Sequence, residues 1–217
     1  MRKTTRYSTS HLPESQFEPD SRSRVLKNLL HITSKREMDV IEAELYALVQ
    51  PKLMSMFTKD HRFTATDICT IHGAWLSEIY EWAGQYRQVN ISKGEFSFAR
   101  ARHVPKLMQD FEAGPLKEYT PCRFKTDEEV ITALAVTHTE LMLVHPFREG
   151  NGRAGRLLAV LMAFQAGLPG LDFSGIRGKK RKEYFAAVQA GMERDYAPMK
   201  KVIASVLSRT RRTHGQR

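Results

Sequence analysis

Apolar residues recur at intervals of three and four positions in several long segments, and this spacing constrains the fold more than any other feature. It places them on one face of a helix, which is then buried against other helices. A capping box, Thr126 with Glu129, predicts one helix start, and Gly167 with Pro169 predicts the end of a helix that starts near Asn151. The periodic sets are Ile68, Ile71, Trp75, Ile79 and Trp82, with a stop at Gly84; Val130, Leu134, Thr137 and Leu141; Tyr184, Val188 and Met192; and Met199, Val202, Ile203, Val206 and Leu207.

One stretch has the pattern of β-structure. Residues 86–92 are followed by Lys93-Gly94 and then by residues 96–98, which is typical of a short hairpin. The length of 217 residues favours one domain. We therefore expect an all-α fold, a helical bundle with one short β-hairpin.

The composition restricts the partners and the compartment. A net charge of +10 favours anionic partners such as nucleotides, nucleic acid or an acidic protein. Cys69 and Cys122 have no metal-site spacing and suit a reducing compartment. There is no apolar run of about 18 residues and no signal-peptide pattern, so we expect a cytoplasmic protein without a membrane segment. We also expect a flexible N-terminal arm over residues 1–21, a folded domain over 22–207 and a basic tail over 208–217.

The segment with the clearest chemistry is HPFREGNGRAGR, residues 145–156. Gly150 and Gly152 leave room for backbone N–H groups to close on an anion, and a following helix would direct its positive end to the same place. Arg153 and Arg156 lie three positions apart, so both guanidinium groups face the same side of that helix. These features predict a site for a polyphosphate.

Two further residues of this segment add chemistry to the anion site. Glu149 is an oxygen ligand of the kind that Mg²⁺ uses together with substrate phosphates. It could equally be a helix-start acid or an ion-pair partner of the arginines. His145 titrates near neutrality and can take a proton from a hydroxyl group. A lone histidine after an apolar run is more often a core residue, but its place at the mouth of the glycine turn favours catalysis.

The segment resembles the signature of the Fic (filamentation induced by cAMP) family, HxFx(D/E)GNGRxxR, and every fixed position of the signature is filled. The resemblance extends to VLKNLLHI near Val25, which looks like the opening helix of the family. It also includes the Trp-Ala-Gly turn and flap hairpin over Tyr80 to Ala99, and GMERDYAPM from Gly191. In total it covers about residues 22–207. The resemblance implies the Fic fold and a toxin-type protein adenylyltransferase, which transfers AMP from ATP to a Ser, Thr or Tyr hydroxyl of another protein.

The resemblance also implies a role for each site residue. His145 would be the general base, and Glu149 would hold Mg²⁺. The flap would hold the segment of the target that carries the hydroxyl, and the segment after Gly191 would lie near the adenine. The phosphate-binding residues would be Gly150, Asn151, Gly152, Arg153 and Arg156; the flap residues Ile91, Ser92, Lys93 and Gly94; and the adenine-side residues Asp195 and Tyr196.

Three alternative functions match parts of the sequence. A dinucleotide-binding fingerprint over Gly150 to Gly155 is disfavoured, because residues 146–149 separate it from any preceding strand and no βαβ pattern follows. A nucleic-acid-binding module is suggested by the basic runs at 177–182 and 209–217. A Doc-like phosphotransferase would carry a Lys at Gly152, so the glycine favours AMP transfer.

The family is commonly inhibited by a helix with the pattern (S/T)xxxE(G/N), whose glutamate pairs with the second motif arginine. Thr33-x-x-x-Glu37 comes nearest, but Met38 follows it, and residues 196–217 contain no Asp or Glu. We therefore expect inhibition by a separate small antitoxin that supplies the pattern in trans. Relatives of the toxin type modify bacterial type II topoisomerases, and secreted relatives modify host GTPases. The small size favours a type II topoisomerase as the target.

Overall fold

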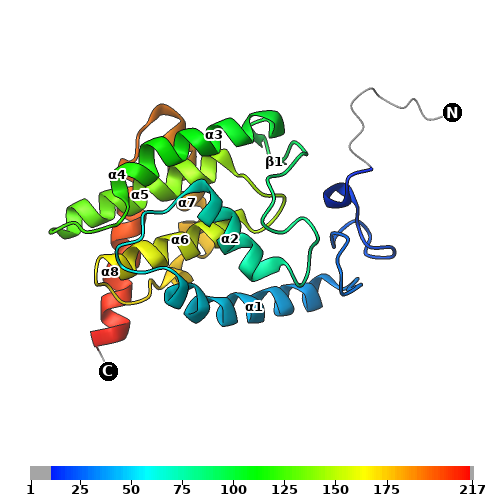
Figure 1. The fold of residues 1–217 in the computed structure, drawn as a ribbon, viewed down its shortest axis with the longest axis horizontal. Coiled ribbons are helices and arrows are strands. Elements are labelled where there is room, and N and C mark those ends of the chain that lie inside the picture. Colours follow the sequence, from blue (N-terminus) through cyan, green and yellow to red (C-terminus); the bar gives the residue numbers. More distant parts are fainter. Residues whose placement is uncertain (1–10, 216–217) are drawn as a thin grey trace.

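Helices α5 (Asp127–Val144) and α6 (Asn151–Gln165) form the centre of the fold in the computed structural model, which describes residues 11–215 (Figure 1). Both helices are buried along most of their length. Helix α8 (Ala197–Gly215) packs against α5 and α7 (Gly178–Ala190), while α1 (Lys35–Met56) and α2 (Ala65–Leu76) pack against α6. The bundle therefore surrounds one helix that the periodicity predicts, α5, and one that the sequence marks by its start near Asn151 and its stop at Gly167, α6.

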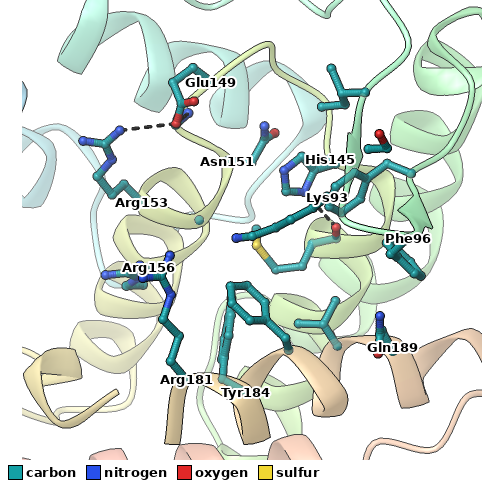
Figure 2. Close-up of a pocket in the computed structure, with 18 of the residues that line it drawn as sticks. Lys93, Phe96, His145, Glu149, Asn151, Arg153, Arg156, Arg181, Tyr184 and Gln189 are labelled. Atoms are coloured by element: carbon teal, nitrogen blue, oxygen red, sulfur yellow. Dashed lines mark hydrogen bonds and ion pairs between the residues drawn. The ribbon is translucent and has the colours of Figure 1, made fainter. Parts of the chain in front are cut away.

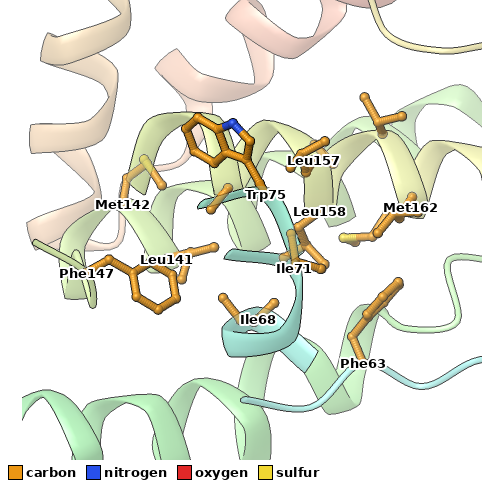
Figure 3. Close-up of a cluster of buried hydrophobic side chains, with 14 of the residues drawn as sticks. Phe63, Ile68, Ile71, Trp75, Leu141, Met142, Phe147, Leu157, Leu158 and Met162 are labelled. Carbon is orange, nitrogen blue, oxygen red and sulfur yellow. The ribbon is translucent and has the colours of Figure 1, made fainter. Parts of the chain in front are cut away.

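Side-chain caps define the starts of these helices. Thr126 with Glu129 and Thr64 with Asp67 form complete capping boxes before α5 and α2, and Ser34 accepts from Glu37 N before α1. Between α2, α5 and α6 lies a dry cluster built around Trp75, Phe147 and Leu158 (Figure 3). Phe147 thus anchors the loop between α5 and α6 in the core.

The remaining elements are short. The hairpin consists of β1 (Ser92–Lys93) and β2 (Phe96–Ser97), antiparallel, with Ser92 opposite Ser97 and Lys93 opposite Phe96. The predicted all-α fold with one hairpin is confirmed for residues 11–215. The other elements are η1 (Pro13–Ser15), η2 (Ala101–His103), α3 (Val104–Phe111), the π-turn η3 (Glu112–Leu116), α4 (Lys117–Tyr119), η4 (Phe173–Gly175) and η5 (Gly191–Glu193).

The hairpin is shorter than its sequence pattern, and its turn is Gly94-Glu95 rather than Lys93-Gly94. Residues 86–91 form no strand because their backbone groups bond to other segments. Arg87 N donates to Pro146 O at 2.8 Å, and Gln88 N donates to the Glu14 carboxylate at 2.6 Å.

The helix expected near Val25 does not form, so that prediction is wrong. The Asn28 side chain accepts from the backbone N–H groups of Leu30 and Ile32 and donates to the carbonyl oxygens of Leu26 and Ile32. Such local bonds pair the backbone N–H and C=O groups within a loop, so these groups are no longer available for the hydrogen bonds of a helix.

Helix α2 also ends earlier than the spacing predicts. It ends at Leu76, and Ile79 and Trp82 lie in the turns that follow, where their side chains are buried in the core. Gly84 has φ +79°, and a Cβ there would lie 3.0 Å from Cys69 O, so the chain folds back tightly against α2. Met192 is exposed because α7 ends at Ala190.

The described parts of the two terminal segments, residues 11–21 and 208–215, are more ordered than predicted. From residue 11 the expected flexible arm is packed: Glu14 and Glu18 are buried, and Glu18 accepts from Asn28 N at 2.8 Å. The expected basic tail continues α8, and Arg211 forms two bonds to Asp127, of 2.6 and 2.7 Å. Residues 1–10 and 216–217 of these two segments lie outside the described range. Among residues 11–215, no helix has the length and apolar character needed to cross a membrane.

Candidate active site

A cavity of about 910 Å³ opens where the start of α6, the loop after α5, the hairpin and α7 meet (Figure 2). All the motif residues that we singled out line it, as do three of the four flap residues. Gly94 lies beyond the lining. The lining residues from the sequence predictions are His145, Glu149, Gly150, Asn151, Gly152, Arg153, Arg156, Ile91, Ser92 and Lys93.

His145 presents a neutral imidazole to this cavity. It follows the last turn of α5 in a left-handed conformation, φ 50° and ψ 62°, and its ring stacks on Phe98 with 3.7 Å between centroids. Its Nδ1 lies 3.0 Å from Met142 O, which assigns the proton to Nδ1 and leaves the lone pair of Nε2 free. Burial lowers the pKa of His145 to about 4, so the ring is a proton acceptor at neutral pH.

Arg87 fixes the backbone of this histidine. Its guanidinium is buried and donates to the carbonyl oxygens of four residues on either side of the active site. The bonds are 2.7 Å to His145 O, 3.4 Å to Val144 O, 2.8 Å to Val89 O and 2.6 Å to Ala99 O. One side chain therefore ties the catalytic loop to both ends of the flap segment.

The Asn151 side chain supports the loop rather than pointing to a ligand. Its Nδ2 donates to Phe147 O and its Oδ1 accepts from Phe147 N, both at 2.8 Å. His72 stacks on the Phe147 ring at 3.8 Å, and its Nε2 donates to Glu149 O at 3.0 Å. The predicted phosphate-binding role of Asn151 is thus limited to its backbone N–H.

Gly150 can only be a glycine here. It has φ +82°, and a Cβ would lie 2.8 Å from the Trp75 ring. It is the N-cap of α6, and no side chain caps this helix, so the N–H groups of Asn151 and Gly152 keep the unpaired state of a helix start. A Cβ on Gly152 would meet only Arg156 Nη2, at 3.8 Å. An anion can therefore approach the helix start closely.

The two motif arginines lie in different surroundings. Arg156 lines the cavity. Arg153 is held on three sides: its Nη1 lies 2.6 Å from Glu42 Oε2, its Nη2 lies 3.5 Å from Glu149 Oε1, and its guanidinium lies 4.4 Å from the Trp75 ring centroid. Glu149 is the one carboxylate among the lining residues, with Lys93, Arg148, Arg153, Arg156 and Arg181 around it. The cavity is therefore strongly cationic.

The far wall of the cavity is formed by α7, which the sequence reasoning missed. Tyr184, Phe185 and Gln189 line it, and Lys93 Nζ lies 3.8 Å from the Phe185 ring centroid, so the flap touches α7 across the cavity. The periodicity of the sequence predicts that Tyr184 and Val188 lie on a buried helix face. It does not show that this face also lines a cavity.

Asp195 and Tyr196 are not among the residues that line the cavity, and their expected adenine-side place stays a prediction. The Tyr196 hydroxyl donates to Glu140 Oε1 at 2.5 Å, and Asp195 Oδ1 accepts from Ala197 N at 3.0 Å. Both residues shape the turn into α8.

The comparisons with known proteins agree on the family. The family model described as Fic/DOC family matches residues 62–163. The probable protein adenylyltransferase Fic of Salmonella typhimurium is 31% identical over 150 residues, 67% of this chain and 70% of that protein. The protein with the same name in Escherichia coli is 31% identical over 144 residues, 64% of this chain and 67% of that protein.

A solved structure agrees on the fold. The BepC protein of Bartonella tribocorum, a VirB-translocated effector with bound AMPPNP, has a TM-score of 0.71 and 20% identity. The match covers 90% of this chain and 97% of that one. The chain belongs to the Fic/DOC family.

Proposed function

We propose that this chain transfers AMP from ATP to a Ser, Thr or Tyr hydroxyl of another protein, with His145 as the general base. The enzyme class follows from the family: two relatives that are 31% identical over about two thirds of the chain carry the name probable protein adenylyltransferase Fic, and the chain is an enzyme of this class. The donor nucleotide, the acceptor residue, the metal and the regulation are the parts that we propose.

One observation carries the proposal. A neutral imidazole with a free Nε2 lies in the same cavity as the unpaired N–H groups of a helix start and two arginines. The arginines and N–H groups suit the triphosphate, and the imidazole suits an incoming hydroxyl. Nε2 takes the hydroxyl proton, the hydroxyl oxygen bonds to the α-phosphorus, and the bond from that phosphorus to the bridging oxygen breaks to release pyrophosphate.

The cavity also fits a magnesium ion bound through the nucleotide. Residues 11–215 contain no group of three or more His, Cys, Asp or Glu side chains that could hold a metal alone. Glu149 supplies a single, half-exposed carboxylate next to the arginines. Mg²⁺ commonly binds through one or two carboxylates and substrate phosphates, and it would neutralise charge on the triphosphate. Glu149 would hold it after exchanging its contact with Arg153.

The flap gives the target a place to bind. Ser92 and Lys93 of β1 are exposed and line the cavity, so an extended target segment would add to the hairpin as a strand. Its hydroxyl would then lie over His145. The Doc-like alternative predicts a Lys in place of Gly152, and the glycine at this position favours AMP transfer.

The test is a pair of labelling reactions. The chain is incubated with a bacterial lysate, Mg²⁺ and ATP labelled at the α- or the γ-phosphate. We expect protein labelling from the α-label alone, loss of labelling with EDTA, and loss in His145→Ala but not in His214→Ala, which removes an exposed imidazole from α8. Labelling from the γ-label would support phosphotransfer instead. Steeply salt-dependent DNA binding with no labelling would support the nucleic-acid module.

We also propose that the enzyme is a cytoplasmic toxin with a separate antitoxin. Glu37, the nearest match to the inhibitory pattern, is exposed and forms no ion pair with a motif arginine in the described residues. A peptide carrying (S/T)xxxE(G/N) should therefore inhibit labelling, while Glu37→Gly should leave it unchanged. A large rise in activity for Glu37→Gly would show inhibition in cis. Purified type II topoisomerase is the first target to assay.

A further inference from the structure

Glu42 places a carboxylate behind the phosphate-binding arginines, and no motif of the sequence marks it. It lies in the middle of α1, where α1 meets α2 and α6, and only 2% of its side-chain surface is exposed. Buried carboxylates are rare unless they are paired. Its partner is Arg153, more than a hundred positions later in the chain, at 2.6 Å between Oε2 and Nη1.

The carboxylate is held from both ends. The Tyr80 hydroxyl donates to Glu42 Oε1 at 2.9 Å, and the Trp75 indole donates to Glu42 O at 3.0 Å. Oε2 has no aligned hydrogen bond in the described structure, so Arg153 satisfies it as an ion pair alone. The carboxylate therefore has one charged neighbour, and that neighbour is a residue of the catalytic motif.

The pairing fixes the direction of the Arg153 guanidinium. Trp75 covers one face of the group at 4.4 Å, and Glu42 holds Nη1, so the group cannot rotate freely. Its Nη2 end remains at the cavity, where it contacts Glu149 at 3.5 Å. Arg153 has 27% of its side-chain surface exposed, and this is the part that can meet an anion.

We propose that Glu42 is a positioning residue, which pre-orients Arg153 toward the phosphates of the nucleotide. An exposed arginine loses much side-chain entropy when it binds an anion, and an arginine fixed in advance loses less. Glu42 does not block an anion from Arg153, because it binds Nη1, at the end of the guanidinium that faces the core. This inference rests on the proposed function, because it concerns the same anion site.

The test compares Glu42→Gln with Tyr80→Phe. The first change keeps the shape but removes the charge that holds Arg153, and the second removes the other bond of the same carboxylate. Binding of Mg-ATP and of inorganic tripolyphosphate is measured by calorimetry, together with KM and kcat for labelling. We expect Glu42→Gln to weaken binding of both probes and raise KM for ATP about tenfold, with kcat within about threefold. Tyr80→Phe should change binding less than threefold.

A coupling measurement separates positioning from a structural role. In an Arg153→Ala background, Glu42→Gln should weaken binding no further, because there is no arginine left to orient. An equal loss in both backgrounds would overturn the inference, and so would unchanged binding in Glu42→Gln. Increased activity in Glu42→Gln would also overturn it, since the carboxylate would then be inhibitory. If Glu42→Gln fails to fold, Glu42→Asp keeps the charge and withdraws it by one methylene, and unchanged binding there overturns the inference.

The same measurements distinguish failure of the inference from failure of the proposed function. If the unaltered chain binds Mg-ATP and Glu42→Gln binds it equally well, the inference alone fails. If the unaltered chain binds tripolyphosphate but not ATP, the proposed donor is wrong, and the role of Glu42 is decided by tripolyphosphate. If the unaltered chain binds neither, both proposals are wrong.

Discussion

Acid should destabilise this protein at a higher pH than its carboxylates alone would require, because three histidines are held neutral. Burial lowers the pKa of His72, His138 and His145 from 6.5 to about 4. His72 accepts from Gly84 N, and His138 accepts from the Tyr184 hydroxyl at 2.8 Å. Protonation of either ring removes an acceptor that the fold uses.

The sign and size of the effect follow from these pKa values. Between pH 6.5 and about 4 the unfolded chain binds more protons than the folded one, so stability is complete above pH 6.5 and is lost as the pH falls. At pH 5, which lies about 1.5 pH units below the pKa of an unfolded histidine, each histidine lowers the free energy of unfolding by about 2 kcal/mol. The sum for three is about 6 kcal/mol, an upper estimate comparable to the whole stability of a typical domain.

The assay is urea denaturation at a series of pH values, with NMR titration of the histidine ring protons. We expect the free energy of unfolding to fall steeply from pH 6.5 to 5, with an uptake of two to three protons on unfolding. The ring signals of His72 and His138 should not titrate above pH 5 in the folded protein. A stability that stays level between pH 7 and 5, or ring signals that titrate near 6.5, would refute the reasoning.

Three substitutions test other parts of the structure. Gly150→Ala should lower the free energy of unfolding by about 2 kcal/mol or displace the loop, because of its positive φ and the contact with Trp75, and thermal unfolding measures this. Arg87→Lys should lower kcat about tenfold or more while ATP binding changes little, because a lysine cannot donate to all four carbonyl groups. Steady-state kinetics measure both quantities. Arg211→Ala should lower the free energy of unfolding by less than about 1 kcal/mol, because its ion pair with Asp127 is exposed to solvent. A larger drop in the free energy of unfolding would contradict this.

Features encoded in adjacent residues could be predicted from the sequence. The capping box at Thr126 and Glu129 marks the start of α5, and Gly167 with Pro169 marks the end of α6 within two residues. The gathering of the motif residues at one cavity could be predicted for the same reason, since the glycines, arginines and histidine lie within twelve positions. Each of these signals needs no knowledge of how distant segments pack.

Features that depend on distant partners could not be predicted. Residues 11–18 have the composition of a flexible arm, yet Glu14 accepts from Gln88 N, and its carbonyl accepts from Arg148 at 2.9 Å. Periodicity places Tyr184 on a buried face but cannot tell a core from a cavity wall. The bonds of Tyr196 to Glu140 and of Asp195 to Ala197 N could not be predicted either, because a resemblance in sequence does not fix the direction of a turn.

The motif itself divides into residues that we propose contact the nucleotide and residues that hold the others in place. The Asn151 side chain forms two hydrogen bonds with the backbone of Phe147. Gly150 has no side chain and therefore leaves room for the Trp75 ring. Trp75 then covers Arg153, which connects the loop geometry to the guanidinium orientation. A change at any of these supporting positions should therefore alter nucleotide affinity through Arg153, even though none of these side chains needs to touch the nucleotide.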